Sequence, residues 1–362
     1  GDYPYIPVFK ENKDGAYYPF ENESGQLEYL ETYRPNVFNN KLKWEETTTW
    51  NAGIDFGFFK NRLTGSLDYY YRITNDLLNV VDIPMGTNFS NRVVSNIGSL
   101  TNNGLELALN GRIISQRDFS WEVGANFTHN QNKITKLTTG TGEGYYVATG
   151  GISTGTGTNA QAHAVDYPAS SFYVYKQIYD AAGKPIEGEF EDMNDDGVIN
   201  SEDLYFFKSP APDLLIGLSS KLIYKDFDFS FSLRSSIGNY MFNDVAARSH
   251  DMSITGIWST SGSFSNKPRS ALYTNFTQNK TNAHLSDYYV QNASFLRMDN
   301  ITAGYSFENL FGIIKSARVY ATVQNPFVVS PYEGLDPEKF DGIDRDLYPR
   351  PMISLIGLSL QF

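Results

Sequence analysis

Hydrophobic and polar side chains alternate with a period of two in many parts of the chain. In residues 51–59, the apolar Ile54, Phe56 and Phe58 are separated by a polar or small residue at each step. Residues 227–234 show the same pattern, with three Phe and one Leu between Asp, Ser, Ser and Arg. A period of two puts alternate side chains on opposite faces of a strand, whereas a helix repeats every ~3.6 residues. The pattern predicts an all-β fold.

The same test predicts about nine strands. They lie at residues 51–59, 62–72, 105–113, 119–128, 214–224, 227–234, 295–307, 317–324 and 352–362, with the first beginning near Trp44. Two residues fit less well, because Leu215 and Ile223 fall on the otherwise polar face of their strand.

The connections between these strands alternate between short and long. Short turns are expected at residues 60–62, 114–118, 225–226 and 308–316, and long loops at residues 73–102, 131–213, 238–294 and 325–351. The long loops are rich in Gly, Ser, Thr, Asn and Asp. Short turns at one end and long loops at the other are typical of an outer-membrane barrel. We therefore predict an antiparallel transmembrane β-barrel over residues 44–362, with long extracellular loops.

Lipid imposes the same pattern, because a strand in a membrane must pair all its backbone groups and point apolar side chains outward at every second position. The other face would line a polar lumen. Tyr and Phe near strand ends, as at residues 69–71, would form the aromatic girdles. A soluble β-sandwich with one solvated face alternates in the same way and remains an alternative.

The last strand ends in ISLIGLSLQF, with Ile356, Leu358, Leu360 and the terminal Phe362 on one face. A terminal aromatic resembles the signal read by the barrel assembly machinery, which would put the C-terminus in the periplasm. The first and last strands then run the same way, so their number is odd, whereas bacterial barrels have an even number. We expect this chain to be the C-terminal part of a larger barrel. Residues 1–43 would be an extracellular loop region, with plug and signal peptide not present.

Composition excludes several other classes. A net charge of −12 and a pI near 4.8 argue against a nucleic-acid partner, because nucleic-acid-binding proteins carry clusters of basic residues. The chain contains no cysteine, so thiolate metal sites and disulfides are excluded. No run approaches the roughly 18 apolar residues that a spanning helix needs.

Several phrases along the chain are distinctive when taken together. They are LKWEETTTWNAGIDFGFFKNRLTGSLDYYYRITNDLL at residues 42–78, SNIGSLTNNGLELALNGRI at residues 95–113, DMNDDGVINSED, NASFLRMDNITAGYSF, VYATVQNPFV and the closing GLDPE and YPRPMISLIGLSLQF. In sequence and in order they resemble one family, the SusC-like (RagA-like) TonB-dependent outer-membrane transporters of Bacteroidetes. The resemblance covers nearly the whole chain.

The resemblance implies a barrel of about 22 strands, within the range of such proteins. It also implies a SusD-like surface lipoprotein as a lid and TonB-driven import of oligosaccharides or peptides. Coupling to TonB would use an N-terminal part that this sequence does not contain. A barrel that has lost transport and serves a surface complex stays open as an alternative.

One acidic segment has the spacing of a calcium loop. Its expected ligands are Asp192, Asn194, Asp196, the carbonyl of Val198, and Asp203. They occupy positions 1, 3, 5, 7 and 12, with Gly197 at position 6 for the tight turn, and hard oxygen donors suit Ca²⁺. The closing Asp is shorter than the usual Glu. An acidic turn that satisfies only its own backbone is the alternative.

Aromatic residues in the loops are candidates for stacking on sugars or peptide side chains. They are Tyr145, Tyr146, Tyr240, Phe242, Trp258, Tyr288 and Tyr289. Packing against the lid is the alternative for each.

Catalysis is not expected. Glu106 and Glu122 would both face the lumen on neighbouring strands, as a glycosidase pair would. A water-filled barrel presents such charges anyway, so we interpret them as lumen lining. A β-rich hydrolase and a secreted glycan-binding sandwich remain the rival interpretations.

Overall fold

The structure is a computed structural model of the chain. It describes residues 4–11, 17–84, 86, 90–137, 145–153, 157–253, 257–258, 264–277, 283–310, 314–345 and 348–362. Among the helices in these ranges, none is long and apolar enough to cross a membrane.

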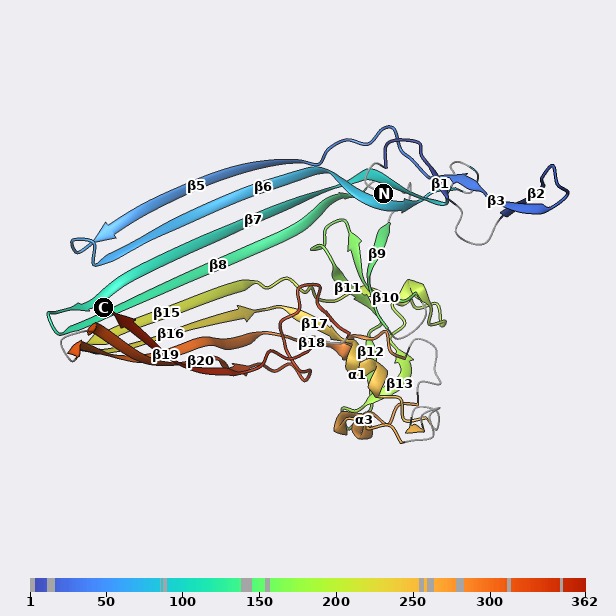
Figure 1. The fold of residues 1–362 in the computed structure, drawn as a ribbon. Coiled ribbons are helices and arrows are strands. Elements are labelled where there is room, and N and C mark those ends of the chain that lie inside the picture. Colours follow the sequence, from blue (N-terminus) through green and yellow to red (C-terminus); the bar gives the residue numbers. More distant parts are fainter. Residues whose placement is uncertain are drawn as a thin grey trace.

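Nine antiparallel strands form one curved sheet (Figure 1). They are β5 (Glu46–Phe58), β6 (Leu63–Asp82), β7 (Arg92–Ser115), β8 (Phe119–Leu137), β15 (Leu214–Tyr224), β16 (Phe227–Ile237), β19 (Phe295–Leu310), β20 (Ile314–Val329) and β22 (Ile353–Gln361). Their order is β22-β20-β19-β16-β15-β8-β7-β6-β5, so each strand lies beside its neighbour in this series. The prediction of about nine alternating strands is confirmed, and a two-sheet sandwich is ruled out.

The sheet is open. Among the described residues, β5 and β22 each pair on one side only and do not pair with each other. The register places apolar residues of neighbouring strands side by side, as with Leu67, Leu107 and Phe127 on β6, β7 and β8. One face of the whole sheet is therefore apolar and the other polar.

The expected long loop at residues 73–102 is mostly strand. β6 and β7 stay paired up to Asp82 and Arg92, and only residues 83–91 connect them. A strand needs about 9–11 residues to cross a bilayer, so this hairpin continues well past that length. The period-two pattern breaks near Asp76, where the register shifts and φ is positive, and this break hid the strand from the sequence analysis.

The polar face lines the hollow side of the sheet. Side chains from β6, β7, β8, β15 and β16 surround a cavity of about 810 Å³ near the short turns. On this face Arg318 donates from Nε and Nη2 to the two carboxylate oxygens of Asp228. An ion pair inside the curve and apolar side chains outside it are the arrangement that the alternation predicted.

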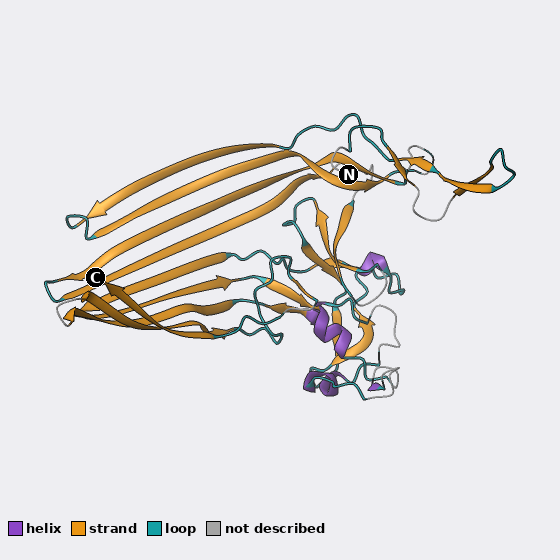
Figure 2. Cartoon of the chain, in the orientation of Figure 1, coloured by secondary structure: helices purple, strands orange, loops and turns teal. Residues whose placement is uncertain are grey.

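The long connections fold together at one end of the sheet (Figure 2). We call residues 145–213, 238–294 and 330–345 the loop domain. Its elements are β9 (Tyr146–Gly151), β10 (Asn159–Ala164), β11 (Ser171–Val174), β12 (Gln177–Tyr179), β13 (Pro185–Phe190), η1 (Ser201–Asp203), β14 (Tyr205–Phe206), β17 (Tyr240–Asn243), α1 (Asp244–Ser249), α3 (Arg269–Thr274), η2 (Asp287–Tyr289), β18 (Val290–Asn292) and β21 (Ile343–Asp344).

This domain has a hydrophobic core of its own. Phe172, Phe242 and Ile343 are fully buried in it, and each comes from a different long connection. Parallel pairing of β17 with β21 joins two of those connections. The Gly-rich and Ser-rich composition predicted loops, but apolar residues far apart in the chain make a packed unit.

In residues 1–43, the last few residues of the segment lie beside the tip of the β6–β7 hairpin. Asn39 donates to the carbonyl of Val94 at 3.0 Å, and the N–H of Lys43 donates to Asn96 at 2.8 Å. The segment contains β1 (Phe9–Glu11), β2 (Tyr17–Glu21), β3 (Leu27–Glu31) and β4 (Tyr33–Pro35), which pair as β1–β4 and β2–β3. The described part of the segment is thus at the same end of the sheet as the loop domain.

Candidate ligand-binding site

A large cavity lies where the polar face of the sheet meets the loop domain. Its volume is about 990 Å³. Its wall includes Asn126, Leu215 and Ser235 from the sheet, and its opposite side includes Gln161 and residues 337–341 from the loop domain. A volume near the top of the ~300–1,000 Å³ range of ligand pockets suits a ligand of several rings or residues.

A buried arginine fastens the 330–345 segment across this cavity. Arg297 on β19 is 2% exposed and forms an ion pair with Asp336, which is 3% exposed. Its Nη1 also donates to Oδ1 of Asn325 at 2.7 Å. Buried charges are costly unless they are paired and hydrogen-bonded, so this geometry fixes where the segment crosses the sheet.

Glu338 adds a second attachment two residues later. Its Oε2 lies 2.9 Å from Nη2 of Arg234 and 2.7 Å from Nη1 of Arg350. Nε of Arg297 is 3.4 Å away. One carboxylate therefore holds together arginines of β16, β19 and the segment before β22.

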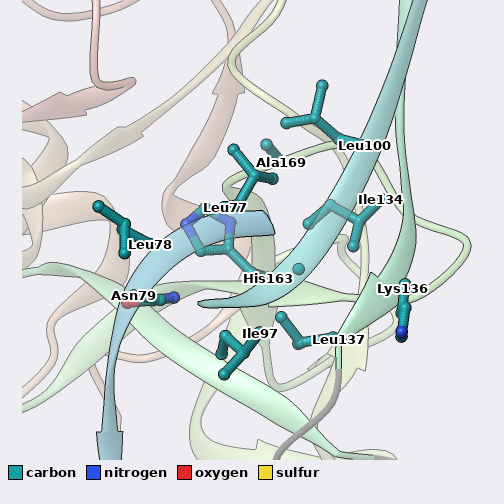
Figure 3. A pocket seen from close by; sticks show the side chains of 11 residues that line it. Leu77, Leu78, Asn79, Ile97, Leu100, Ile134, Lys136, Leu137, His163 and Ala169 are labelled. Atoms are coloured by element: carbon teal, nitrogen blue, oxygen red, sulfur yellow. The ribbon is translucent and has the colours of Figure 1, made fainter. Parts of the chain in front are cut away.

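A smaller apolar pocket lies between the extended β6–β8 strands and β10 (Figure 3). Its volume is about 190 Å³, and Leu77, Ile97 and Ile134 are among its lining residues. His163 also lines it, and Nδ1 of His163 accepts from the N–H of Ser170 at 3.0 Å. Burial lowers the pKa of His163, which favours a neutral ring. The pocket is too small for an oligosaccharide or oligopeptide. It is a gap in the packing between these strands and β10.

The predicted aromatic contacts do not line the large cavity. None of the seven is among the described residues that line it. Phe242 and Tyr289 are buried in the loop-domain core, so a ligand cannot reach them there, and the prediction is corrected for these two. Their burial follows from packing between connections, which the sequence pattern does not show.

The other five aromatics are at least partly accessible. Tyr145, Tyr240 and Tyr288 are half-buried, and burial raises the pKa of Tyr288 to about 12. Tyr146 is exposed and its ring lies 4.7 Å from that of Tyr173. Trp258 is exposed and packs edge-on against another aromatic ring. These residues lie on the surface of the loop domain.

The acidic segment forms a tight turn. The N–H of Gly197 donates to Asp192 at 2.7 Å, and the N–H of Asp196 donates to Asn194 at 3.1 Å. The N–H of Val198 donates to Asp196 at 2.8 Å. Gly197 has φ +81°, which glycine adopts without a steric penalty. The three predicted side-chain ligands at positions 1, 3 and 5 thus all accept from the backbone of their own turn.

Asp203 connects the two ends of this turn through hydrogen bonds. Its side chain is fully buried and accepts from the N–H groups of Asn200 at 2.8 Å and Met193 at 2.9 Å. The N–H of Asn200 is the main reason that the pKa of Asp203 is lowered, so the carboxylate is ionised. Among the described residues, no three His, Asp or Glu side chains gather closely enough to hold a metal ion.

The two lumen-facing glutamates do not meet. Glu106 lies opposite Thr128, whereas Glu122 lies opposite Arg112 and forms an ion pair with it at 3.6 Å. Six positions along β8 separate Thr128 from Glu122, which is about 20 Å at the usual rise of a strand. Glycosidase carboxylates lie about 5–9.5 Å apart, so this pair is lumen lining.

Sequence comparison assigns the sheet to a family. The family model described as TonB dependent receptor-like, beta-barrel, matches residues 13–326. The chain belongs to the TonB-dependent receptors. It is 50% identical to the TonB-dependent receptor SusC of Bacteroides thetaiotaomicron, over 100% of this chain and 36% of that protein. It is 29% identical to the TonB-dependent receptor P3 of Formosa agariphila, over 90% of this chain and 35% of that protein.

Solved structures agree on the fold. The structure of the RagAB peptide transporter matches with a TM-score of 0.77 at 24% identity, over 100% of this chain and 39% of the matched chain. The same importer in its 'open-open' state matches with a TM-score of 0.75. The chain thus spans about 36% of the length of SusC, the first of these relatives.

Membership of the TonB-dependent receptors explains the two faces of the sheet. This is part of an outer-membrane β-barrel, so the exposed apolar face contacts lipid and the polar face lines the lumen. The large cavity then lies at the end of the lumen that carries the loop domain.

Sequence reasoning missed the residues that shape this cavity. Arg297 looked like one polar residue in a predicted strand, and Glu338 like one charge in a loop. The available signal was the segment GLDPEKFDGID, in which one aromatic residue is flanked by Gly, Pro and Asp, as in a structured turn. Pairing of those charges with the sheet could be seen only in the folded chain.

Proposed function

We propose that the protein containing this chain imports nutrient oligomers, either glycans or oligopeptides, across the outer membrane by TonB-dependent active transport. The observation that carries the proposal is the 990 Å³ cavity, which opens on the polar lumen wall and is bounded on its other side by the folded loop domain. A ligand held there would be positioned above the transport path.

The relatives support this proposal. SusC is named as a TonB-dependent receptor, and RagAB is named as a peptide transporter. Family members of this kind are transporters and not enzymes, which agrees with the separation of Glu106 from Glu122. Energy coupling would use parts of the protein outside this chain.

The loop domain would face the cell exterior and the C-terminus the periplasm. In this orientation the accessible aromatics Tyr145, Tyr146, Tyr240, Trp258 and Tyr288 contact either the ligand or a SusD-like lipoprotein lid. Aromatic side chains with one polar edge suit both roles.

The acidic turn would bind Ca²⁺ through Asp192, Asn194, Asp196, the carbonyl of Val198 and Asp203. Support for this comes from the spacing of the residues on one short turn, where Asp192 and Asp196 accept from the backbone, and from the lowered pKa of Asp203. Binding would replace several hydrogen bonds within the turn by bonds to the ion, and would stiffen the loop between β13 and β14.

Uptake by cells tests the main proposal. Cells lacking the gene, and cells complemented with the full-length gene, receive labelled glycan and peptide pools. We expect uptake of one pool only in complemented cells, and its loss when a protonophore collapses the proton gradient. Binding by the purified complex should persist without that gradient.

A structural role in a surface complex makes the opposite prediction. Deleting the gene would then leave uptake of every pool unchanged and would reduce the amount of partner lipoprotein at the cell surface. That result would contradict import.

A further inference from the structure

Arg297 faces the lumen because of a bulge in its strand. Ile301 and Met298 of β19 lie opposite two residues on the apolar face of β16 that are two positions apart. They are themselves three positions apart, so β19 contains one extra residue, Asp299. Without this residue, the alternation of side chains would put Arg297 on the apolar face. Bulges that re-aim a side chain are over-represented at barrel rims and beside active sites.

A second bulge, in β20, brings Asn325 to the same place. Two residues of β20, Asn325 and Pro326, occupy the space opposite Asp299. Asn325 has φ +51°, a left-handed conformation that few residues other than Gly and Asn adopt. Its Oδ1 accepts from Nη1 of Arg297, and its Nδ2 donates to the carbonyl of Arg350 at 2.8 Å. Irregularities in two neighbouring strands thus orient one guanidinium.

Stability alone does not account for an ion pair at this position. Arg297 and Asp336 are both buried, and taking two charges out of water is costly. Replacing such a pair with apolar residues of similar volume often leaves a protein equally stable or more stable. What the pair adds over an apolar contact is direction, because the planar fork of donors on arginine binds a carboxylate in few orientations.

The segment that Arg297 holds is attached to the loop domain at both ends. We call residues 330–345 the crossing segment. Near its start Tyr332 is buried in a small cluster with two loop-domain residues, and near its end Ile343 is fully buried in the loop-domain core. Between these ends Arg297 binds Asp336, and the next five residues line the large cavity. One arginine of the sheet therefore sets how far the middle of the segment stands from the lumen wall.

The attachment at Glu338 is weaker. Its partners Arg234 and Arg350 have side chains that are 37% and 46% exposed, and Glu338 itself is 25% exposed. Ion pairs with this much access to water contribute little, because water solvates the separated charges well. The side chains of Arg297 and Asp336 are only 2% and 4% exposed. Arg297 is therefore the fixed point of the crossing segment.

We propose that Arg297 is a positioning residue of the import site, which holds the crossing segment at one height over the lumen so that the large cavity keeps one size. This inference rests on the proposed import function and names a residue on which that function depends. A cavity whose outer wall is already in place binds its ligand without first ordering that wall. Loss of Arg297 should therefore weaken ligand binding and leave the maximal rate of transport unchanged.

The test removes the ion pair as a whole from the full-length protein. Arg297→Met combined with Asp336→Leu, the anchor variant, leaves no charge buried without a partner. Arg318→Met combined with Asp228→Leu is the matched control, because that ion pair joins two strands of the sheet and no part of the loop domain. Heat-modifiable gel mobility shows whether each variant still forms a barrel.

The distance between two spin labels reports the position of the crossing segment. The labels are attached at Phe340→Cys, which is exposed and lines the cavity, and at Ile356→Cys, which is exposed on β22. The chain contains no cysteine of its own. We expect a broader distance distribution in the anchor variant and the wild-type distribution in the control.

Uptake of the labelled glycan and peptide pools by cells gives the functional readout. If the segment is in place for a tenth of the time in the anchor variant, the concentration for half-maximal uptake rises about ten-fold, since apparent affinity scales with the competent fraction. The maximal rate should not change, whereas a barrel that only folds poorly would lose maximal rate. If the anchor variant forms no barrel, the same readouts on Arg297→Lys decide, because lysine keeps the charge and loses the fork of donors.

Each contrary result has a distinct meaning. A wild-type distance distribution in a folded anchor variant would overturn the positioning role and leave import intact. A lower maximal rate at an unchanged half-maximal concentration would also overturn it. Uptake of neither pool by wild-type cells would count against the proposed import function, and the label distances would still decide whether Arg297 positions the segment.

Discussion

The sheet and the loop domain are stabilised in opposite ways. In the sheet, large apolar side chains such as Trp50 and Ile54 are exposed on the outer face, and the backbone is satisfied by neighbouring strands. In the loop domain, Phe172 and Ile343 are buried in one hydrophobic cluster, as in the core of a water-soluble protein. The same chain is thus built for lipid along the strands and for water at their ends. Matched substitutions in the two regions should therefore have different costs.

The largest difference is expected for a buried aromatic. Phe172→Ala should destabilise the loop domain by about 3–5 kcal/mol, since it leaves a cavity in a closed core. Phe229→Ala on the apolar face of β16 leaves no closed cavity and should cost less. Limited proteolysis of the loop domain, together with heat-modifiable gel mobility of the barrel, measures both. Similar losses for the two variants would refute the distinction.

A charge on the apolar face should have the next largest effect. Leu107 lies on that face between Leu67 and Phe127, and Leu107→Arg should cost about 2–4 kcal/mol near the membrane midplane. Asn110→Arg places the same charge on the polar face and serves as the control. Reversible unfolding in urea with lipid vesicles gives the two free energies. Equal stability of the two variants would contradict the assignment of the faces.

Acid should weaken the loop domain but not the sheet. His250 is 2% exposed with Nε2 2.9 Å from Ser270 Oγ, and burial, aided by Lys267, lowers its pKa from 6.5 to about 4. Because the folded pKa is below the unfolded one, the neutral ring contributes stability that is full above pH 6.5 and is lost as the pH falls toward 4. By pH 5 the loss is about 2 kcal/mol.

Hydrogen exchange of α1 and α3 between pH 5 and 7 measures this loss, with the amides of the sheet as an internal reference. His250→Gln should flatten the profile. Part of the slope should remain, since burial also lowers the pKa values of His163 and His284. An unchanged profile in His250→Gln would show that His250 does not contribute.

Calcium should have the smallest effect. At a free concentration ten times the Kd, binding to the turn stabilises the loop domain by about 1.4 kcal/mol. Asp196→Asn should remove this gain, whereas Asp195→Asn should keep it, because position 4 supplies no ligand. Thermal unfolding with and without Ca²⁺, against Mg²⁺, provides the measurement. A gain that survives Asp196→Asn would place the ion elsewhere.

The strands could be predicted from sequence because the alternation of apolar and polar residues is visible within each strand. The alternation in residues 227–234 needs no partner to be recognised, and all nine predicted strands occur. The prediction was incomplete where a local break interrupts the pattern, as at Asp76 in β6. It also did not show the loop-domain core, because Phe172, Phe242 and Ile343 pack together across long stretches of sequence.

The sequence by itself determined the fold class, the family and the two faces of the sheet, since a lipid-facing strand must repeat every two residues whatever lies beside it. Only the tertiary structure decided that Phe242 and Tyr289 are core residues, and that Phe340 stands exposed in the cavity. The physical reason is that burial and ion pairing depend on what other segments bring to the same place. For Phe340 those segments are β16, β19 and β10, which supply Arg234, Arg297 and Gln161.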